Sequence, residues 1–243
     1  MIRPPSDLDL LHLWEIGSLR HPIDRALLLY AWMHPEQPPA SLPDLPLGQI
    51  HLALVQLRRA IFGNRIEGYA DCEACGVRLD LPLDAGQLLQ AGQPATAEAS
   101  VVVAGQRFRA PTSRDLAALN AVHDPPGAAT LLMERCRIGS PDREAAAGDA
   151  IPAAAPPIEA VSAALEELDP AADLALTVDC GACGHQGELH LDVLSLLWEE
   201  LGSRVRSLLL EVHRLARAYG WREAEILGLS RQRRAAYLSL VGP

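Results

Sequence analysis

The sequence predicts an α+β fold that is mostly helical and contains one small zinc-ribbon-like β unit. Two observations support this fold class. Apolar residues recur at helical spacing over most of the 243 residues, which is the pattern of amphipathic helices. Two copies of a Cys-x-x-Cys-Gly stretch, at 72–76 and 180–184, are each followed by alternating apolar positions of the kind found in strands. We therefore expect each copy to lie at the turn of a hairpin.

Each Cys-x-x-Cys-Gly stretch has the form of a metal knuckle, in which two thiolates face one ion and the glycine adopts a backbone conformation that other residues avoid. Two knuckles make one four-thiolate site, so the predicted ligands of a structural Zn²⁺ are Cys72, Cys75, Cys180 and Cys183. Four cysteines close the coordination shell, whereas a catalytic zinc keeps an open position. His185 is then left without a ligand role and is expected beside the site or facing solvent.

Two other interpretations of these cysteines stay open. The site could have lost its metal in this protein. A redox Cys-x-x-Cys needs a thiol near a helix N-terminus in a thioredoxin-like setting, which two copies flanked by strands fit poorly. The fifth cysteine, Cys136, lies in an apolar helical stretch and is expected to be buried.

Helices are predicted wherever apolar residues recur every three or four positions between glycine or proline breaks. These stretches are 8–16, 23–33, 48–62, 112–122, 128–137, 158–168, 192–219, 223–227 and 230–240. Asp124-Pro125-Pro126-Gly127 is interpreted as a break between two of them. Residues 101–109 predict a hairpin that turns near Gly105 and Gln106.

Three regions follow from this order of elements. Residues 1–138 hold the N-terminal helices, the first knuckle and the hairpin, and residues 158–243 hold the second knuckle and the C-terminal helices. Between them, residues 139–157 are rich in Ala, Pro, Gly and Asp without periodicity, which predicts a flexible linker.

The formal charge of −10 argues against nonspecific nucleic-acid binding by the whole chain. The charge is uneven, because residues 201–243 carry +5 and the remainder carries −15. The N-terminus lacks the apolar core of a signal peptide, and no apolar run is long enough to span a bilayer, so a cytoplasmic protein is expected. Reducing conditions there favour zinc over disulfides.

The sequence contains no set of residues that indicates an enzyme. Gly-x-Ser-x-Gly, His-Glu-x-x-His and phosphate-binding glycine loops are all missing, and the adjacent glutamates at 166–167 and 199–200 are most simply solvated helix faces. We predict a non-enzymatic protein.

The stretch 219–240 is the second informative segment. A short helix, a Gly-Leu-Ser turn and a helix with three arginines also describe a DNA-reading helix-turn-helix. The favoured interpretation is a helical unit that docks on a protein partner, because the body is acidic and Gln232 is the one polar residue there suited to reading bases. The core of this unit is expected to consist of Trp221, Ile226, Tyr237 and Leu238. The candidate partner-binding residues are Trp221, Ile226, Arg231, Arg233, Arg234 and Tyr237.

Motifs along nearly the whole chain resemble a family from contractile injection systems, with residues 139–157 as the variable part. The segments that carry the resemblance are Leu13-Trp14-Glu15, Asp24-Arg25-Ala26-Leu27, Phe62-Gly63, both Cys-x-x-Cys-Gly stretches, Phe108 to Leu116, Glu211 to Ala216, Trp221 to Leu227 and Arg233 to Leu238. The family looks like the zinc-knuckle relatives of the T-even phage baseplate hub proteins, and the ending is also similar to tail-assembly chaperones that handle the tape-measure protein.

The resemblance implies a baseplate component or assembly factor of a contractile tail, with baseplate, tube or tape-measure proteins as partners. The alternative is a zinc-ribbon helix-turn-helix regulator that binds DNA through its C-terminal arginines.

Overall fold

The structure is a computed structural model that describes residues 4–90, 92–139 and 156–241. It confirms the predicted fold class, since helices dominate and the strands form small antiparallel sheets. The helices are α1 (Asp7–Gly17), α2 (Pro22–Met33), the 3-10 turn η1 (Leu42–Asp44), α3 (Leu47–Phe62), α4 (Ala85–Leu88), α5 (Ser113–Leu119), α6 (Pro125–Cys136), α7 (Ile158–Leu168), α8 (Val193–Tyr219), α9 (Glu223–Leu227) and α10 (Arg231–Leu240). The strands are β1 (Arg65–Asp71), β2 (Arg78–Asp84), β3 (Ser100–Val103), β4 (Gln106–Arg109), β5 (Arg137–Ile138), β6 (Ala175–Asp179) and β7 (Gln186–His190).

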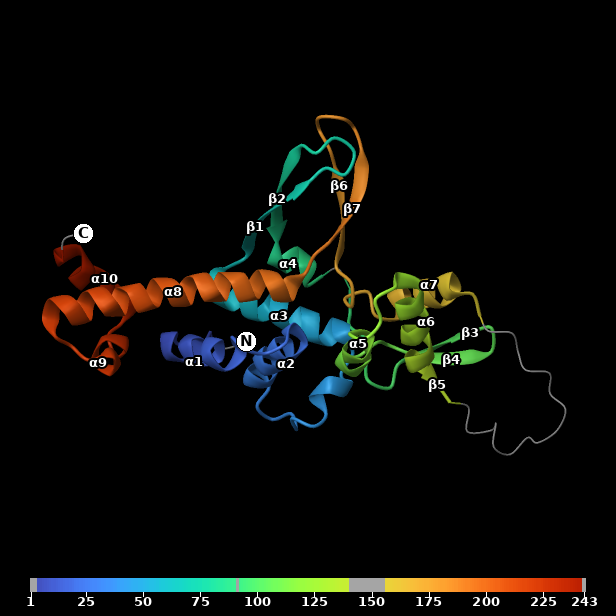
Figure 1. Ribbon diagram of the computed structural model, residues 1–243, viewed down its shortest axis with the longest axis horizontal. Helices are drawn as coiled ribbons and strands as arrows, with labels where there is room; N and C mark the ends of the chain where they lie inside the picture. Colours follow the sequence, from blue (N-terminus) through green and yellow to red (C-terminus); the bar gives the residue numbers. More distant parts are fainter. Residues whose placement is uncertain (1–3, 91, 140–155, 242–243) are drawn as a thin grey trace.

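The main core lies where α1, α2 and α3 pack against the first half of α8 (Figure 1). Leu54 and Leu57 of α3 and Leu197 and Leu201 of α8 are completely buried there. The apolar stripe of α8 has the predicted helical spacing, so one face of this 27-residue helix supplies much of the core. The core thus joins residues of the region 1–138 to residues of the region 158–243.

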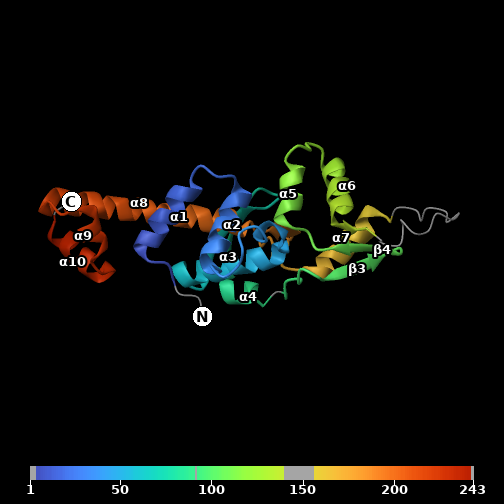
Figure 2. The same ribbon diagram turned by 90° about the horizontal axis from the view of Figure 1, so that it is seen from below.

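The molecule is elongated because α8 is about 40 Å long and its second half extends beyond the three N-terminal helices. At the far end of α8 the chain turns back, and α9 and α10 pack on the helix. Figure 2 shows this C-terminal unit at one end of the molecule and α5, α6 and α7 at the other.

Two hairpins, β1–β2 and β6–β7, project from the helical layer side by side, with their turns at the same end (Figure 1). Their bases reach the main core, where Ile66 of β1 and Leu174 just before β6 are buried. The strand β7 leads almost directly into α8, and the side chain of Asp192 caps this helix by accepting a hydrogen bond from the amide of Ser195.

A smaller core lies between the sheet β3–β4–β5 and the helices α6 and α7. Phe108, Cys136 and Val161 are its buried members. Cys136 at the end of α6 is completely buried, as predicted, and burial raises the pKa of its thiol to about 11.

Asp115 in the first turn of α5 is a buried carboxylate that ties this smaller part together. It forms ion pairs with Arg109 of β4, at 2.6 Å, and with Arg135 of α6, at 3.0 Å. Its oxygens also accept hydrogen bonds from the amide and the hydroxyl of Thr112. Burial by itself would raise the pKa of Asp115, but the donors Arg109 and Thr112 hold this pKa below its usual value.

We expect Asp115→Asn to lower the free energy of unfolding at neutral pH by about 3 kcal/mol, because it leaves two partly buried guanidinium groups without their carboxylate. A carboxylate whose pKa is depressed on folding contributes stability above its unfolded pKa, and this contribution is lost as the pH falls below about 4. Urea unfolding between pH 7 and pH 2.5 should therefore show a smaller loss of stability on acidification in the variant. Glu134→Gln, on the exposed face of α6, is the matched control and should follow the wild-type pH dependence.

Three local predictions need correction. The predicted break between two helices is present, because α5 and α6 are separate, but the second helix begins at Pro125 rather than at residue 128. Pro125 and Pro126 form its first turn, where a missing amide costs no hydrogen bond, and Asp124 caps it. The 101–109 hairpin turns one residue earlier than predicted, at Ala104 and Gly105, which both have positive φ as a two-residue turn requires.

The last of the three corrections concerns α5, which ends at Leu119 rather than near residue 122. The predicted linker at 139–157 lies almost entirely outside the described residues. Within the described part of the chain, no helix combines the length and the apolar character needed to cross a membrane.

Candidate metal centre

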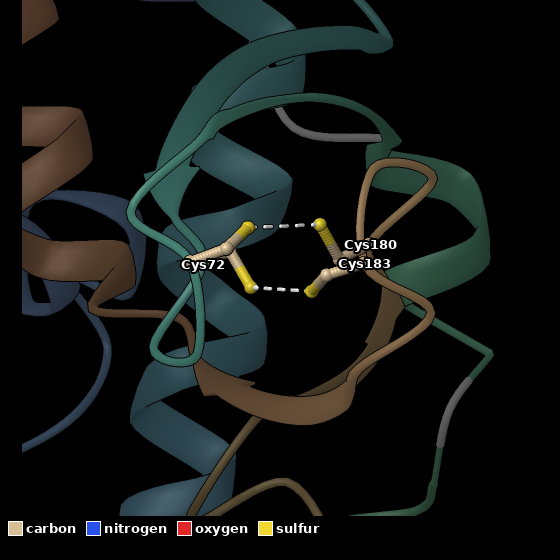
Figure 3. Close-up of side chains that lie close together, drawn as sticks. Cys72, Cys180 and Cys183 are labelled. Carbon is tan, nitrogen blue, oxygen red and sulfur yellow. Dashed lines mark hydrogen bonds between the residues drawn. The ribbon is translucent and has the colours of Figure 1, made fainter.

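The turns of the two hairpins bring together the four cysteines that the sequence singles out. Their sulfur atoms all lie within 4.8 Å of one another, although the two pairs come from stretches more than a hundred residues apart. Two cross-hairpin distances are shorter, at 3.8 Å from Cys72 Sγ to Cys183 Sγ and 3.7 Å from Cys75 Sγ to Cys180 Sγ. Figure 3 shows the side chains of Cys72, Cys180 and Cys183 pointing into the space between the hairpins. No disulfide links the cysteines, and the cluster can hold a metal ion.

The two knuckles have the same backbone hydrogen bonds, so they are structural as well as sequence copies. In the first, Cys72 donates to the carbonyl of Val77 and Gly76 donates to the carbonyl of Cys72. In the second, Cys180 donates to the carbonyl of His185 and Gly184 donates to the carbonyl of Cys180. The glycines have φ values of 71° and 74°, which L side chains avoid. The predicted role of the knuckle glycines is thereby confirmed.

Backbone amides point at the sulfurs and favour their charged form. Hydrogen bonds from the amides of Cys183 and Ala182 lower the pKa of Cys180 to about 6. The amide of Val77 acts on Cys75 in the same way, but hydrogen bonds with the other thiols and desolvation outweigh it and raise the pKa of Cys75 to about 12. The thiolate of Cys180 therefore forms at a lower pH than the thiolate of Cys75. A cation bound between the sulfurs would favour the thiolate form of the cysteines.

One knuckle cysteine of each pair is buried and the other is exposed. Cys72 and Cys180 are 5% and 2% exposed, whereas Cys75 and Cys183 are exposed to solvent although their sulfurs belong to the cluster. His185 is exposed and contributes no atom to the four-sulfur cluster, in line with the expectation that it faces solvent. An ion here would be enclosed by protein on one side and lie near the surface on the other.

Arg58 fixes the first hairpin relative to the second, and sequence reasoning did not identify it. Its guanidinium group is 5% exposed and pairs with Glu200 of α8 at 2.7 Å. It also donates to the carbonyls of Gly63 and Arg65 at the base of β1. Because β7 continues into α8, this one side chain anchors the bases of both hairpins. Glu200 is therefore not a solvated-face residue as expected, and no sequence signal beyond an arginine in an apolar stripe pointed to the pair.

The predicted partner-binding residues fall into two groups. Trp221 and Tyr237 are partly exposed and pack edge to face with ring centroids 4.9 Å apart, and Tyr219 stacks on Trp221 at 4.6 Å. Arg231 and Arg233 are exposed in the first turn of α10, which Ser230 caps as predicted. These four residues share the end of the molecule formed by α9 and α10.

Arg234 and Ile226 lie inside the protein and do not belong to that surface. Arg234 is 1% exposed, and its guanidinium group pairs with Asp7 of α1 and Glu211 of α8. Arg204 of α8 joins the same two carboxylates, so the group is a four-residue ion-pair network. The expectation that Arg234 contacts a partner is wrong for this reason. Helix α10 turns this arginine toward α8 and leaves its two neighbours outside.

The four-cysteine cluster is the candidate functional centre that the described residues support best. Its four sulfurs lie within 4.8 Å of one another, so the cluster could hold one metal ion. Comparison of the chain with protein-family models, with curated proteins and with solved structures finds no match.

Proposed function

We propose that this chain is a non-enzymatic component or assembly factor of a contractile injection system, held in shape by one structural Zn²⁺. The closed four-cysteine cluster is the observation that carries the proposal. It lies between two sequence-distant hairpins, where one bound ion would link them. The tail role rests on the motif resemblance that runs along nearly the whole sequence.

The geometry and chemistry of the sulfurs favour zinc as the ion. Zinc bound tetrahedrally by thiolates has Zn–S distances of about 2.3 Å, which places neighbouring sulfurs about 3.8 Å apart. The two cross-hairpin distances of 3.8 and 3.7 Å agree with that spacing. Soft thiolates exclude the hard cations Mg²⁺ and Ca²⁺, and a four-cysteine shell leaves no open position for a reacting water. Bound there, Zn²⁺ would act as a cross-link, and Cys72, Cys75, Cys180 and Cys183 would hold it.

The C-terminal unit supplies the surface for a tail partner. It stands at the C-terminal end of α8 and presents aromatic rings next to the basic first turn of α10. Trp221 and Tyr237 offer large amphipathic contacts, and Arg231 and Arg233 offer charge. A baseplate, tube or tape-measure protein with an acidic and apolar face would fit this end of the molecule.

The regulator alternative has less support, because Arg234 is committed to an internal ion-pair network. Two exposed arginines remain on α10, and α9 has only five residues. A helix-turn-helix needs a recognition helix with several base-reading side chains and a first helix that crosses the backbone.

The test is purification of the tagged protein from its native host, with mass spectrometry of the bound proteins and zinc measured in the same sample. We expect baseplate, tube or tape-measure proteins together with one zinc per chain. Arg231→Ala/Arg233→Ala should release these partners and keep the zinc, while Arg20→Ala/Arg107→Ala, two exposed arginines elsewhere, should keep both.

Two outcomes would overturn the proposal. Recovery of DNA and transcription proteins, lost in the same double variant and sensitive to salt, would establish the regulator instead. Purified protein without zinc would remove the structural-metal part, whatever the partner.

A further inference from the structure

Among the described residues, each of the two hairpins is a two-stranded sheet, so β2 and β6 each have an edge without a further strand, and these edges border one groove. At one end of the β6–β7 pair, the amide of Cys180 donates a hydrogen bond to the carbonyl of His185. At the other end, the amide of Leu191 donates to the carbonyl of Leu174. In an antiparallel pair alternate residues bond to the partner, so the backbone groups of Thr177 and Asp179 point away from β7. The same reasoning applies to β2, where the groups of Arg78, Asp80 and Pro82 point away from β1.

An open groove of about 440 Å³ separates these two edges. Consecutive residues line it, from Arg78 to Leu83 on β2 and from Leu176 to Asp179 on β6. One face of a strand contributes only every second side chain, so an uninterrupted lining means that the strand edges themselves border the groove. Apolar side chains of Leu79, Leu81, Leu83, Leu176 and Val178 make up half of this lining.

The two edges are not equivalent. Pro82 lacks an amide hydrogen at an outward position of β2, a feature that protects an edge strand from pairing. The outward position of Thr177 in β6 keeps both its donor and its acceptor. An added strand can therefore form more backbone hydrogen bonds with β6 than with β2. On the other side of the groove, β2 offers leucine side chains for apolar contacts.

The charged residues around the groove are mostly acidic, which favours a positively charged ligand. The hairpins and their flanks, residues 64–84 and 173–192, hold nine acidic residues and two arginines, a formal charge of −7 with neutral histidines. At the groove, Arg78 is engaged with the ring of Tyr69 at 4.0 Å. Asp80 and Asp179 are exposed and have no ion-pair partner among the described residues. An extended segment that carries lysine or arginine complements these carboxylates.

We propose that the groove between β2 and β6 binds an extended basic segment of a partner protein, which adds a third strand to β6. The segment would alternate apolar residues, packed on the leucines of β2, with arginine or lysine residues beside Asp80 and Asp179. The five residues of β6 set the length of the bound strand at about five residues. This site is separate from the C-terminal unit, so it holds whether or not the partner belongs to a contractile tail.

The test uses the full-length protein and a labelled peptide, acetyl-Arg-Val-Arg-Val-Arg-Val-Arg-amide, in a fluorescence-anisotropy titration. We expect saturable binding that weakens with added salt, and no binding of the matching peptide with glutamate in place of arginine. Thr177→Pro removes one outward amide of β6 and should weaken binding at least about tenfold. Glu188→Pro removes an outward amide from the opposite edge of the same hairpin and should leave the affinity within about twofold.

Zinc content and circular dichroism show whether each proline variant is folded. A second measurement needs no variant of the protein. It compares the affinities of two isomers of the peptide, one N-methylated on the valine amides and the other on the arginine amides. One isomer should lose binding and the other keep it, because only alternate amides face β6. Equal affinity of the two isomers, equal affinity of wild type and folded Thr177→Pro, or binding of the glutamate peptide would overturn the proposal.

Discussion

Replacing Cys180 by alanine is expected to abolish metal binding and to unfold much of the protein at 37 °C. Cys180 is the buried cysteine of the second knuckle, and its loss leaves three thiolates that cannot close the shell. Structural zinc contributes on the order of 10–16 kcal/mol of apparent binding free energy in small zinc modules at neutral pH. A metal bound by both knuckles would also close a loop of 105–111 residues. By the treatment used for disulfides, the entropy lost by the unfolded chain would then stabilise the folded state by roughly 5 kcal/mol.

The measurement is zinc content together with urea unfolding followed by far-UV circular dichroism. Cys136→Ala is the matched control, because Cys136 is a buried cysteine in the smaller core away from the cluster. It should lose about 1 to 2 kcal/mol, as a small core truncation does, and keep a full equivalent of zinc. Chelation of the wild-type protein should reproduce the Cys180→Ala result. Wild-type stability that is unchanged after complete zinc removal would contradict the structural role of the metal.

Arg234→Ala is expected to cost about 3 kcal/mol and to release the C-terminal unit from α8. The guanidinium group is almost completely buried, so its removal leaves the carboxylates of Asp7 and Glu211 with Arg204 as their remaining partner. It also removes a hydrogen bond to the carbonyl of Leu229 in the turn between α9 and α10. The network joins α1, α8 and α10, and its loss therefore acts on both ends of the chain.

Near-UV circular dichroism can follow this release, because Tyr237 of α10 packs edge to face on Tyr219 and Trp221 only when α10 is docked. Arg233→Ala is the matched control: the neighbouring arginine is exposed, and its loss should change stability by less than about 0.5 kcal/mol. Equal unfolding free energies for the two variants would show that the buried network does not hold the unit. Retention of the aromatic signal in Arg234→Ala would show that other contacts dock α10.

The candidate metal centre was predictable from the sequence to the level of its four ligands. Cys-x-x-Cys-Gly is a local signal, because the spacing places two thiols on one turn and the glycine supplies the positive φ. The duplication then identifies the partner knuckle without knowledge of the fold. The helices were predictable for a similar reason, since the 3.6-residue period of α3 and α8 reflects a buried stripe that each helix carries by itself.

Ion pairs between distant residues were not predictable in this way. Arg58 and Glu200 are 142 positions apart, and Arg234 and Asp7 are 227 apart. In the sequence Glu200 looks like part of a solvated helix face, and no residue near Arg58, Asp7 or Arg234 in the chain indicates the partner of its charge. Arg234 resembles Arg231 and Arg233, and only the angle at which α10 docks on α8 decides which arginine is buried.

The amino-acid sequence by itself determined the mostly helical α+β class, the two knuckles and the identity of the four clustered cysteines, because each of these is indicated by residues close together in the chain. The tertiary structure alone decided which charged residues are internal, which strand edges stay open and how the hairpins stand on the helices. Those properties depend on how separate elements pack in space, and a residue's burial there is set by neighbours that come from anywhere in the chain.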